Sequence, residues 1–296
     1  MGQRLIMKKQ DQKIVLVTGA SSGIGKEIAI GLAKVGEHVI IVCRNLEKGQ
    51  AALEEIKARS NSKSIDLLIA DLSSQVEIRK LAEVINTQYP ALHVVINNAG
   101  LALTKKTLSA DGIEMTLATN YLGPFLLNNL LIDLLKKSAP ARIINVSSAI
   151  QKWAKLDLND LQFEHRKYKG LKAYAQSKLL MNIMTFELAR RLAATEITVN
   201  CVHPGAVKTA IGSSSANTFL LKLLDKAIKF FFISPQKAAK GIVYLATCPM
   251  VEKVTGKYFE KGKAVPSSAI TYDPVIAKAV CDITDHLLQS VSNRTK

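Results

Sequence analysis

The sequence predicts a single α/β domain over residues 1–296, built on a doubly wound parallel sheet with helices on both faces. Apolar β-branched runs alternate with helical stretches along most of the chain, and no linker or low-complexity segment interrupts them. The apolar runs are hydrophobic throughout rather than at alternate positions, which is typical of strands that are covered on both faces. Ligands of such a sheet bind beyond the carboxyl ends of its strands.

Each expected element has a local reason in the chain. The first strand is a β-branched apolar run that ends at Gly19, and the first helix closes at Gly36. Later helices carry apolar residues at helical spacing. The expected strands cover 13–19, 38–43, 64–71, 92–100, 141–148 and 197–205, and the expected helices cover 25–36, 46–59, 74–88, 111–137 and 172–194.

The composition argues against several classes of protein. The four cysteines are scattered and form no CxxC pair, so we expect neither a disulfide framework nor a metal site, and a reducing, cytoplasmic location. The net charge of +16 comes from dispersed lysines without interleaved aromatic residues, so we do not expect a nucleic-acid partner. Residues 1–12 contain no secretory signal and are expected to form a flexible arm, and no apolar run reaches the ~20 residues of a membrane span.

A glycine-rich turn, TGASSGIGKE, follows the first expected strand and opens the first helix. Glycines at this point allow a tight turn and let backbone N–H groups approach a pyrophosphate at the helix N-terminus. Ala20 and Glu27 do not fit a P-loop, so a Rossmann-type dinucleotide site is favoured. The cofactor-binding residues expected from this turn are Gly19, Ser21, Ser22, Gly23, Ile24 and Gly25.

The end of the second strand bears on the choice between NAD and NADP. An NAD site usually has an acidic residue there, whereas this chain has Cys43 and Arg44. A guanidinium holds a phosphate well, so NADP(H) is the expected cofactor, with Lys26 adding positive charge nearby. The alternative is that Arg44 is a solvated loop residue. Asp71 and Leu72 end the third strand, where they are expected beside the adenine ring.

Tyr174 and Lys178 lie four residues apart in a stretch without glycine or proline, so they share one face of a helix. A cation beside a phenol favours the phenolate and lowers the phenol's pKa. Taken alone, however, the same spacing is common on helix surfaces.

Other motifs in the chain favour a functional role for Tyr174 and Lys178 over a chance spacing. TGASSGIG, NNAG (97–100), Asn120, Ser147, YAQSK and HPG (203–205) resemble the classical short-chain dehydrogenase/reductase family over roughly residues 13–263. Stretches such as VCRNLEKG and ADGIEMTLATNYLGPFLL are most similar to the retinol dehydrogenase branch, whose members mostly use NADPH.

The resemblance implies a role for each matching residue. Tyr174 would be the general acid or base, Lys178 would lower its pKa and bind the nicotinamide ribose, and Ser147 would hold the substrate oxygen. Asn120 would support a water-mediated proton path to Lys178, and Ser148 is expected to be structural. The resemblance places the remaining cofactor contacts at Asn98, Ala99, Gly100, Pro204, Gly205, Val207 and Thr209.

The substrate side is less determined by the sequence. Within a substrate-lid region at 206–235, the apolar segment 217–233 is interpreted as a lid, as a peripheral membrane contact or as a core or oligomer helix. The first two alternatives favour an apolar carbonyl or alcohol, such as retinal or retinol. Trp153 is expected either to line the substrate pocket or to pack in the core, and 273–296 to form a helix and a polar tail.

Two functions from different classes are compatible with these features. The first is an NADP-dependent reductase or dehydrogenase for hydrophobic carbonyls and alcohols. The second is an NADP(H)-binding regulatory or scaffold protein with little turnover. By analogy with the family, the chain is expected to form a homodimer or a homotetramer.

Overall fold

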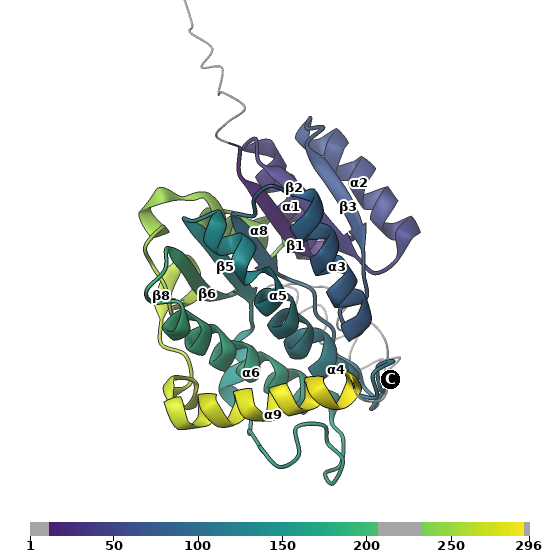
Figure 1. The fold of residues 1–296 in the computed structure, drawn as a ribbon, viewed down its shortest axis with the longest axis vertical. Coiled ribbons are helices and arrows are strands. Elements are labelled where there is room, and N and C mark those ends of the chain that lie inside the picture. The colour runs from purple at the N-terminus through teal and green to yellow at the C-terminus, as the bar shows by residue number, and fades with distance from the viewer. Residues whose placement is uncertain (1–11, 207–232, 293–296) are drawn as a thin grey trace, which may run out of the picture.

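The computed structural model describes residues 12–206 and 233–292. Eight strands in these ranges form one sheet in the order β3-β2-β1-β4-β5-β6-β7-β8 (Figure 1). The strands are β1 (Ile14–Thr18), β2 (His38–Cys43), β3 (Ile65–Ile69), β4 (Val94–Asn97), β5 (Ala141–Val146), β6 (Ile197–His203), β7 (Tyr258–Glu260) and β8 (Lys263–Val265). Neighbouring strands from β3 to β7 pair in parallel, so the predicted doubly wound parallel sheet is confirmed.

The last strand departs from the prediction. β8 pairs antiparallel with β7, and neither strand was expected from the sequence. The two strands are joined by Lys261 and Gly262, which both have positive φ, at 51° and 78°. A two-residue loop with two positive φ values joins antiparallel strands, because its twist matches that of the hairpin.

Helices cover both faces of the sheet, and alternate residues of β1 show the division. Val15 and Val17 pack in a core with α1, α2 and α8, whereas Leu16 packs in a core with α3, α5, α6 and α9. The helices and shorter turns are α1 (Gly23–Lys34), α2 (Leu46–Ser60), α3 (Gln75–Gln88), α4 (Met115–Leu117), η1 (Ala118–Leu122), α5 (Gly123–Lys137), η2 (Ala149–Trp153), α6 (Gly170–Arg191), α8 (Pro235–Thr247), η5 (Pro249–Val251), η6 (Ala269–Tyr272) and α9 (Pro274–Ser292).

Side-chain caps fix where several of these helices begin. Asn45, Ser74 and Ser234 accept hydrogen bonds from backbone N–H groups in the first turns of α2, α3 and α8. Each bond satisfies a donor that has no partner within the helix. The loops at the carboxyl edge of the sheet therefore end at defined residues.

The helix expected over 111–137 is interrupted. It begins only at Met115, where the Glu114 carboxylate accepts from the N–H groups of Thr116 and Leu117, and it passes through a π-helical turn, η1, before α5. Pro124, near the start of α5, has no N–H and cannot donate an i→i−4 bond to the Asn120 carbonyl. The irregular turn therefore lies at a residue that the sequence marked as functional.

The C-terminal helix α9 packs against α6 and runs across the lower part of the molecule in Figure 1. The Tyr121 hydroxyl and Thr284 Oγ1 form a 2.8 Å hydrogen bond between η1 and α9, and both side chains are completely buried. Among the described helices, none is long and apolar enough to cross a membrane.

We expect Thr284→Val to lower the free energy of unfolding by about 1–3 kcal/mol, because it leaves the buried Tyr121 hydroxyl without this partner. Urea denaturation would measure the change. The double variant Tyr121→Phe/Thr284→Val is the control, because it removes both polar partners and should cost less than the sum of the single changes. Strict additivity would contradict the proposed coupling.

Candidate active site

The glycine-rich turn lies between β1 and α1, as expected. Gly19 and Gly23 have positive φ, at 67° and 58°, and a Cβ on Gly19 would come within 2.7 Å of Ala99 Cα. No acidic residue lies in the first turn of α1, and its N-cap residue, Ser22, makes no side-chain capping bond. The first N–H groups of α1 therefore form a suitable site for an anionic group such as a pyrophosphate.

The segment after β4 is hydrogen-bonded to this turn. Thr18 Oγ1 accepts from the backbone N–H groups of Asn98 and Ala99, at 3.0 and 3.1 Å. Asn98 Nδ2 donates in return to the carbonyls of Thr18 (2.9 Å) and Gly19 (3.2 Å). The structure thus brings Gly19, Asn98 and Ala99 together, and it adds Thr18, which the sequence analysis missed.

The carboxyl ends of β2 and β3 bring Arg44 and Asp71 together. Arg44 is largely exposed, and its Nη1 atom lies 3.8 Å from Asp71 Oδ2. Asp71 Oδ1 accepts from the N–H and hydroxyl of Ser73, so this carboxylate is held in place by its own loop. Leu72 follows and is buried. The long contact leaves the Arg44 guanidinium able to bind another anion.

Lys26 does not add free positive charge here, contrary to expectation. Its ammonium pairs with Glu55 of α2 at 2.5 Å, and Arg59 pairs with both Glu55 and Glu27. The sequence could not reveal this pairing, because it depends on the packing of α1 against α2.

Tyr174 and Lys178 lie in the first half of α6. Lys178 is only 3% exposed, and its Nζ atom donates to the Val146 carbonyl at the end of β5, at 2.8 Å. Burial lowers the pKa of Lys178 to about 8, because the ammonium loses its hydration. Its charge therefore changes much closer to neutral pH than that of an ordinary lysine.

Lys178 is not among the groups that shift the pKa of Tyr174 in this structure, contrary to expectation. Burial raises the pKa of Tyr174, and a hydrogen bond from Ser148 only partly opposes the rise. Lys178 Nζ lies 5.7 Å from the centroid of the tyrosine ring. Tyr174 is therefore a protonated phenol at neutral pH and is suited to donate its proton.

The structure also corrects the choice between two adjacent serines. Ser147 is buried, and its hydroxyl points to the backbone carbonyl of Lys178, at 3.4 Å. Ser148 is partly exposed, caps η2 and makes the hydrogen bond to Tyr174. Ser148, not Ser147, therefore stands beside the tyrosine hydroxyl. Nothing in the sequence distinguishes the two, since the distinction depends on which serine meets α6.

Asn120 is completely buried in η1, and its side chain is fully engaged. Oδ1 accepts from the Leu101 N–H at 2.8 Å, and Nδ2 donates to the Leu101 carbonyl (2.8 Å) and to Ser177 Oγ (3.0 Å). A Cβ on Gly100 would lie 3.4 Å from Asn120 Oδ1 and 3.5 Å from Lys178 Nζ, so all three residues are neighbours.

The last predicted cofactor contacts are only partly described. Pro204 and Gly205 follow β6, and Gly205 has a φ of 95°; a Cβ there would come within 2.6 Å of Ile233 Cδ1. The Ile233 N–H donates to the Ala206 carbonyl at 2.8 Å. Val207 and Thr209 lie outside the described residues, as do most of 206–235 and nearly all of 217–233.

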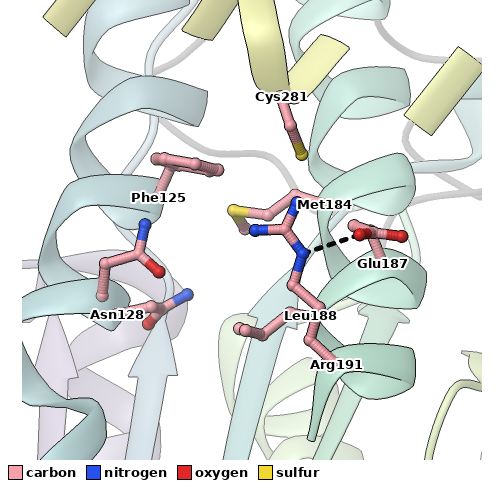
Figure 2. A pocket seen from close by; sticks show the side chains of 8 residues that line it. Phe125, Asn128, Met184, Glu187, Leu188, Arg191 and Cys281 are labelled. Carbon is pink, nitrogen blue, oxygen red and sulfur yellow. Dashed lines mark hydrogen bonds and ion pairs between the residues drawn. The ribbon is translucent and has the colours of Figure 1, made fainter. Parts of the chain in front are cut away.

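A separate cavity lies between α5, α6 and α9 (Figure 2). The Arg191 guanidinium extends into it and pairs with Glu187, with Nε 2.6 Å from Oε1. Phe125, Met184 and Cys281 complete much of its wall. None of its lining residues belongs to the set around Tyr174, so we do not assign it to the reaction.

Comparison with known proteins identifies the family. The short chain dehydrogenase family profile matches residues 13–218. Retinol dehydrogenase 13 of Homo sapiens is 38% identical over 269 residues, which cover 90% of this chain and 81% of that protein. Retinol dehydrogenase 12 of Homo sapiens is 40% identical over 251 residues, covering 85% of this chain and 78% of that protein.

Solved structures agree with this assignment. The Pseudomonas aeruginosa RhlG/NADP complex has a TM-score of 0.69 at 27% identity, covering 83% of this chain and 93% of that one. A variant of actinorhodin polyketide ketoreductase with NADPH has a TM-score of 0.71 at 25% identity, covering 90% of this chain and 100% of that one. The chain therefore belongs to the short-chain dehydrogenase/reductase family of oxidoreductases, in its retinol dehydrogenase branch.

Proposed function

We propose that this oxidoreductase uses NADP(H) to interconvert an apolar aldehyde or ketone and the corresponding alcohol, with retinal and retinol as representative substrates. The observation that carries the proposal is the convergence of Tyr174, Ser148 and the buried Lys178 at the carboxyl end of β5. The substrate class follows the printed names of the relatives, which are retinol dehydrogenases.

The described residues fit a phosphorylated dinucleotide. The first turn of α1, which follows the turn from Gly19 to Gly23, contains no acidic residue. Arg44 lies exposed at the end of β2, and its contact to Asp71 is long. NADP or NADPH is named in the structures of two neighbours. When bound, the nicotinamide would supply or accept the hydride, and the protein's own groups would manage the substrate oxygen and its proton.

Tyr174 and Ser148 are the proposed contacts to the substrate oxygen. Hydride addition to a carbonyl carbon places negative charge on its oxygen, and donors aimed at that atom stabilise the transition state. Because burial raises the pKa of Tyr174, the phenol holds its proton until the oxygen needs it. In the oxidation direction the same group would accept the proton from the alcohol.

Lys178 is proposed to bind the nicotinamide ribose and to replace the proton that Tyr174 donates. Its ammonium is fixed by the Val146 carbonyl and lies close to Gly100 and Asn120. Because the Asn120 side chain is already used, we propose that its backbone carbonyl, which Pro124 cannot bond, holds the water of a proton path to Lys178.

The first experiment measures NADPH oxidation with all-trans-retinal and with medium and long aldehydes. Ser148→Ala should lower kcat/KM by about 10²–10³-fold, because it removes a donor to the substrate oxygen. Ser147→Ala is the matched control and should lose less than about tenfold, because its hydroxyl faces the backbone carbonyl of Lys178.

Tyr174→Phe should abolish turnover in the same assay. Equal losses for the two serine variants would overturn the role given to Ser148. NADPH binding without Tyr174-dependent turnover of any carbonyl would favour the regulatory or scaffold function.

Arg44→Asp should weaken NADPH binding about 10–100-fold while leaving NADH binding nearly unchanged, because only NADPH carries the ribose phosphate. Fluorescence titration of each nucleotide would measure this. Lys48→Asp makes the same charge change in the first turn of α2 and should affect both nucleotides little. If NADPH and NADH lost affinity equally, Arg44 would not be the phosphate ligand.

The lowered pKa of Lys178 also makes the free energy of unfolding depend on pH. Its folded pKa of about 8 lies below the unfolded value of about 10.4, so the unfolded chain holds more protons between these two values. Stability conferred at this site therefore rises with pH across that window. Relative to Lys178→Met, the wild type should gain roughly 2–3 kcal/mol between about pH 7.5 and pH 10.5 in urea unfolding. Parallel pH curves would show that Lys178 keeps an ordinary pKa.

A further inference from the structure

Apolar and cationic side chains gather where the chain leaves Ser148 and where it returns to Tyr174. Trp153 ends η2, five residues after Ser148, and Leu171 lies one helical turn before Tyr174 on α6. η2 packs against α6, and the two groups flank Ser148 and Tyr174 on these two elements. We call this set the mouth surface, and it consists of Lys152, Trp153, Lys155, Lys167, Lys169, Leu171 and Lys172, all of them exposed.

The two apolar members are unusually open to solvent. Trp153 is 81% exposed and Leu171 is 67% exposed. This exposure excludes the expectation that Trp153 packs in the core. An exposed indole and an exposed leucine each lose the stability that burial would provide, and large exposed apolar side chains often mark interaction sites.

The five lysines of the mouth surface have no ion-pair partner among the residues of the described ranges. Two acids in the loop between η2 and α6 are already paired, because Arg166 Nε lies 3.0 Å from Asp160 and 3.6 Å from Asp157. Glu164 is exposed and makes no ion pair with a described residue. A sixth cation, Lys261 in the β7–β8 turn, lies near His203 together with Lys152 and Glu260. Because the lysines outnumber Glu164 and Glu260, the surface carries an excess of positive charge.

This surface lies at the carboxyl edge of the sheet, on the same side as the active site. The connection between η2 and α6 forms the loop that projects at the bottom of Figure 1. A flat partner that met the projecting loop would therefore lie at the same edge of the sheet as Ser148 and Tyr174.

We propose that the mouth surface docks the enzyme on an anionic lipid bilayer. Trp153 and Leu171 enter the interfacial region, and the surrounding lysines bind the lipid headgroups. Apolar substrate then passes between bilayer and active site without crossing water, and this step rests on the proposed function. A nucleic acid fits less well, because its single strands stack on several aromatic side chains and this surface offers one.

Trp153 is the single tryptophan of the chain, so its fluorescence reports this contact directly. We expect vesicles of phosphatidylcholine with phosphatidylserine to shift the emission to the blue, and lipids brominated on the acyl chains to quench it. Vesicles of phosphatidylcholine alone should bind at least about tenfold more weakly, because the lysines then lack anionic headgroups.

Charge reversal tests the lysines. Lys152→Glu/Lys155→Glu should weaken binding to the anionic vesicles by at least about tenfold. Lys34→Glu/Lys63→Glu is the matched control, because both lysines are exposed at the opposite, amino-terminal edge of the sheet, and it should keep most of the affinity. Circular dichroism of each variant would verify that it is folded.

Three results would overturn the proposal. The first is an unchanged Trp153 emission with anionic vesicles, even if the protein sediments with them, since another segment would then be the contact. The second is an equal loss of affinity in the two lysine pairs. The third is a blue shift of the Trp153 emission with RNA, without quenching of that emission by lipids brominated on the acyl chains. Turnover of a short, water-soluble aldehyde without vesicles tests the proposed reaction separately.

Discussion

The hydrogen bond from the Lys178 ammonium to the Val146 carbonyl is the contact on which the geometry of the site depends. A buried ammonium is costly unless its protons are accepted, so this bond holds one face of α6 against the end of β5. With α6 fixed there, Tyr174 one turn earlier meets Ser148, and Ser147 meets the backbone of the helix. Packing of α6 on the sheet thus decides which of the two serines lies beside Tyr174.

A second set of polar contacts fixes the sheet from within. Asn97 Nδ2 on β4 donates to Asn145 Oδ1 on β5 at 2.8 Å and to Asn128 Oδ1 on α5 at 2.9 Å, and Asn145 Nδ2 donates to Thr185 Oγ1 on α6 at 2.9 Å. All these groups are buried, so losing one partner would leave another unsatisfied. The same sheet edge therefore positions the glycine-rich turn, Ser148 and Lys178 relative to one another.

The exposure and polarity of the side chains change from this edge of the sheet outward. Lys178 is buried and Tyr174 is half-buried, and burial moves their pKa values in opposite directions, since protonated tyrosine is neutral and protonated lysine is charged. The mouth surface exposes an indole and lysines that have no ion-pair partner within residues 12–206 and 233–292. A buried polar site beneath an apolar and cationic rim suits a substrate that comes from a lipid phase.

The sequence by itself determined the features that depend on short spacings. Alternating apolar runs predicted the wound sheet, the glycines after the first strand predicted the phosphate turn, and the interval from Tyr174 to Lys178 placed both on one helix face. Only the tertiary structure decided between Ser147 and Ser148, paired Lys26 with Glu55 and exposed Trp153. Those outcomes arise from contacts between segments far apart in the chain, and local spacing carries no information about which of two adjacent side chains will meet a distant helix.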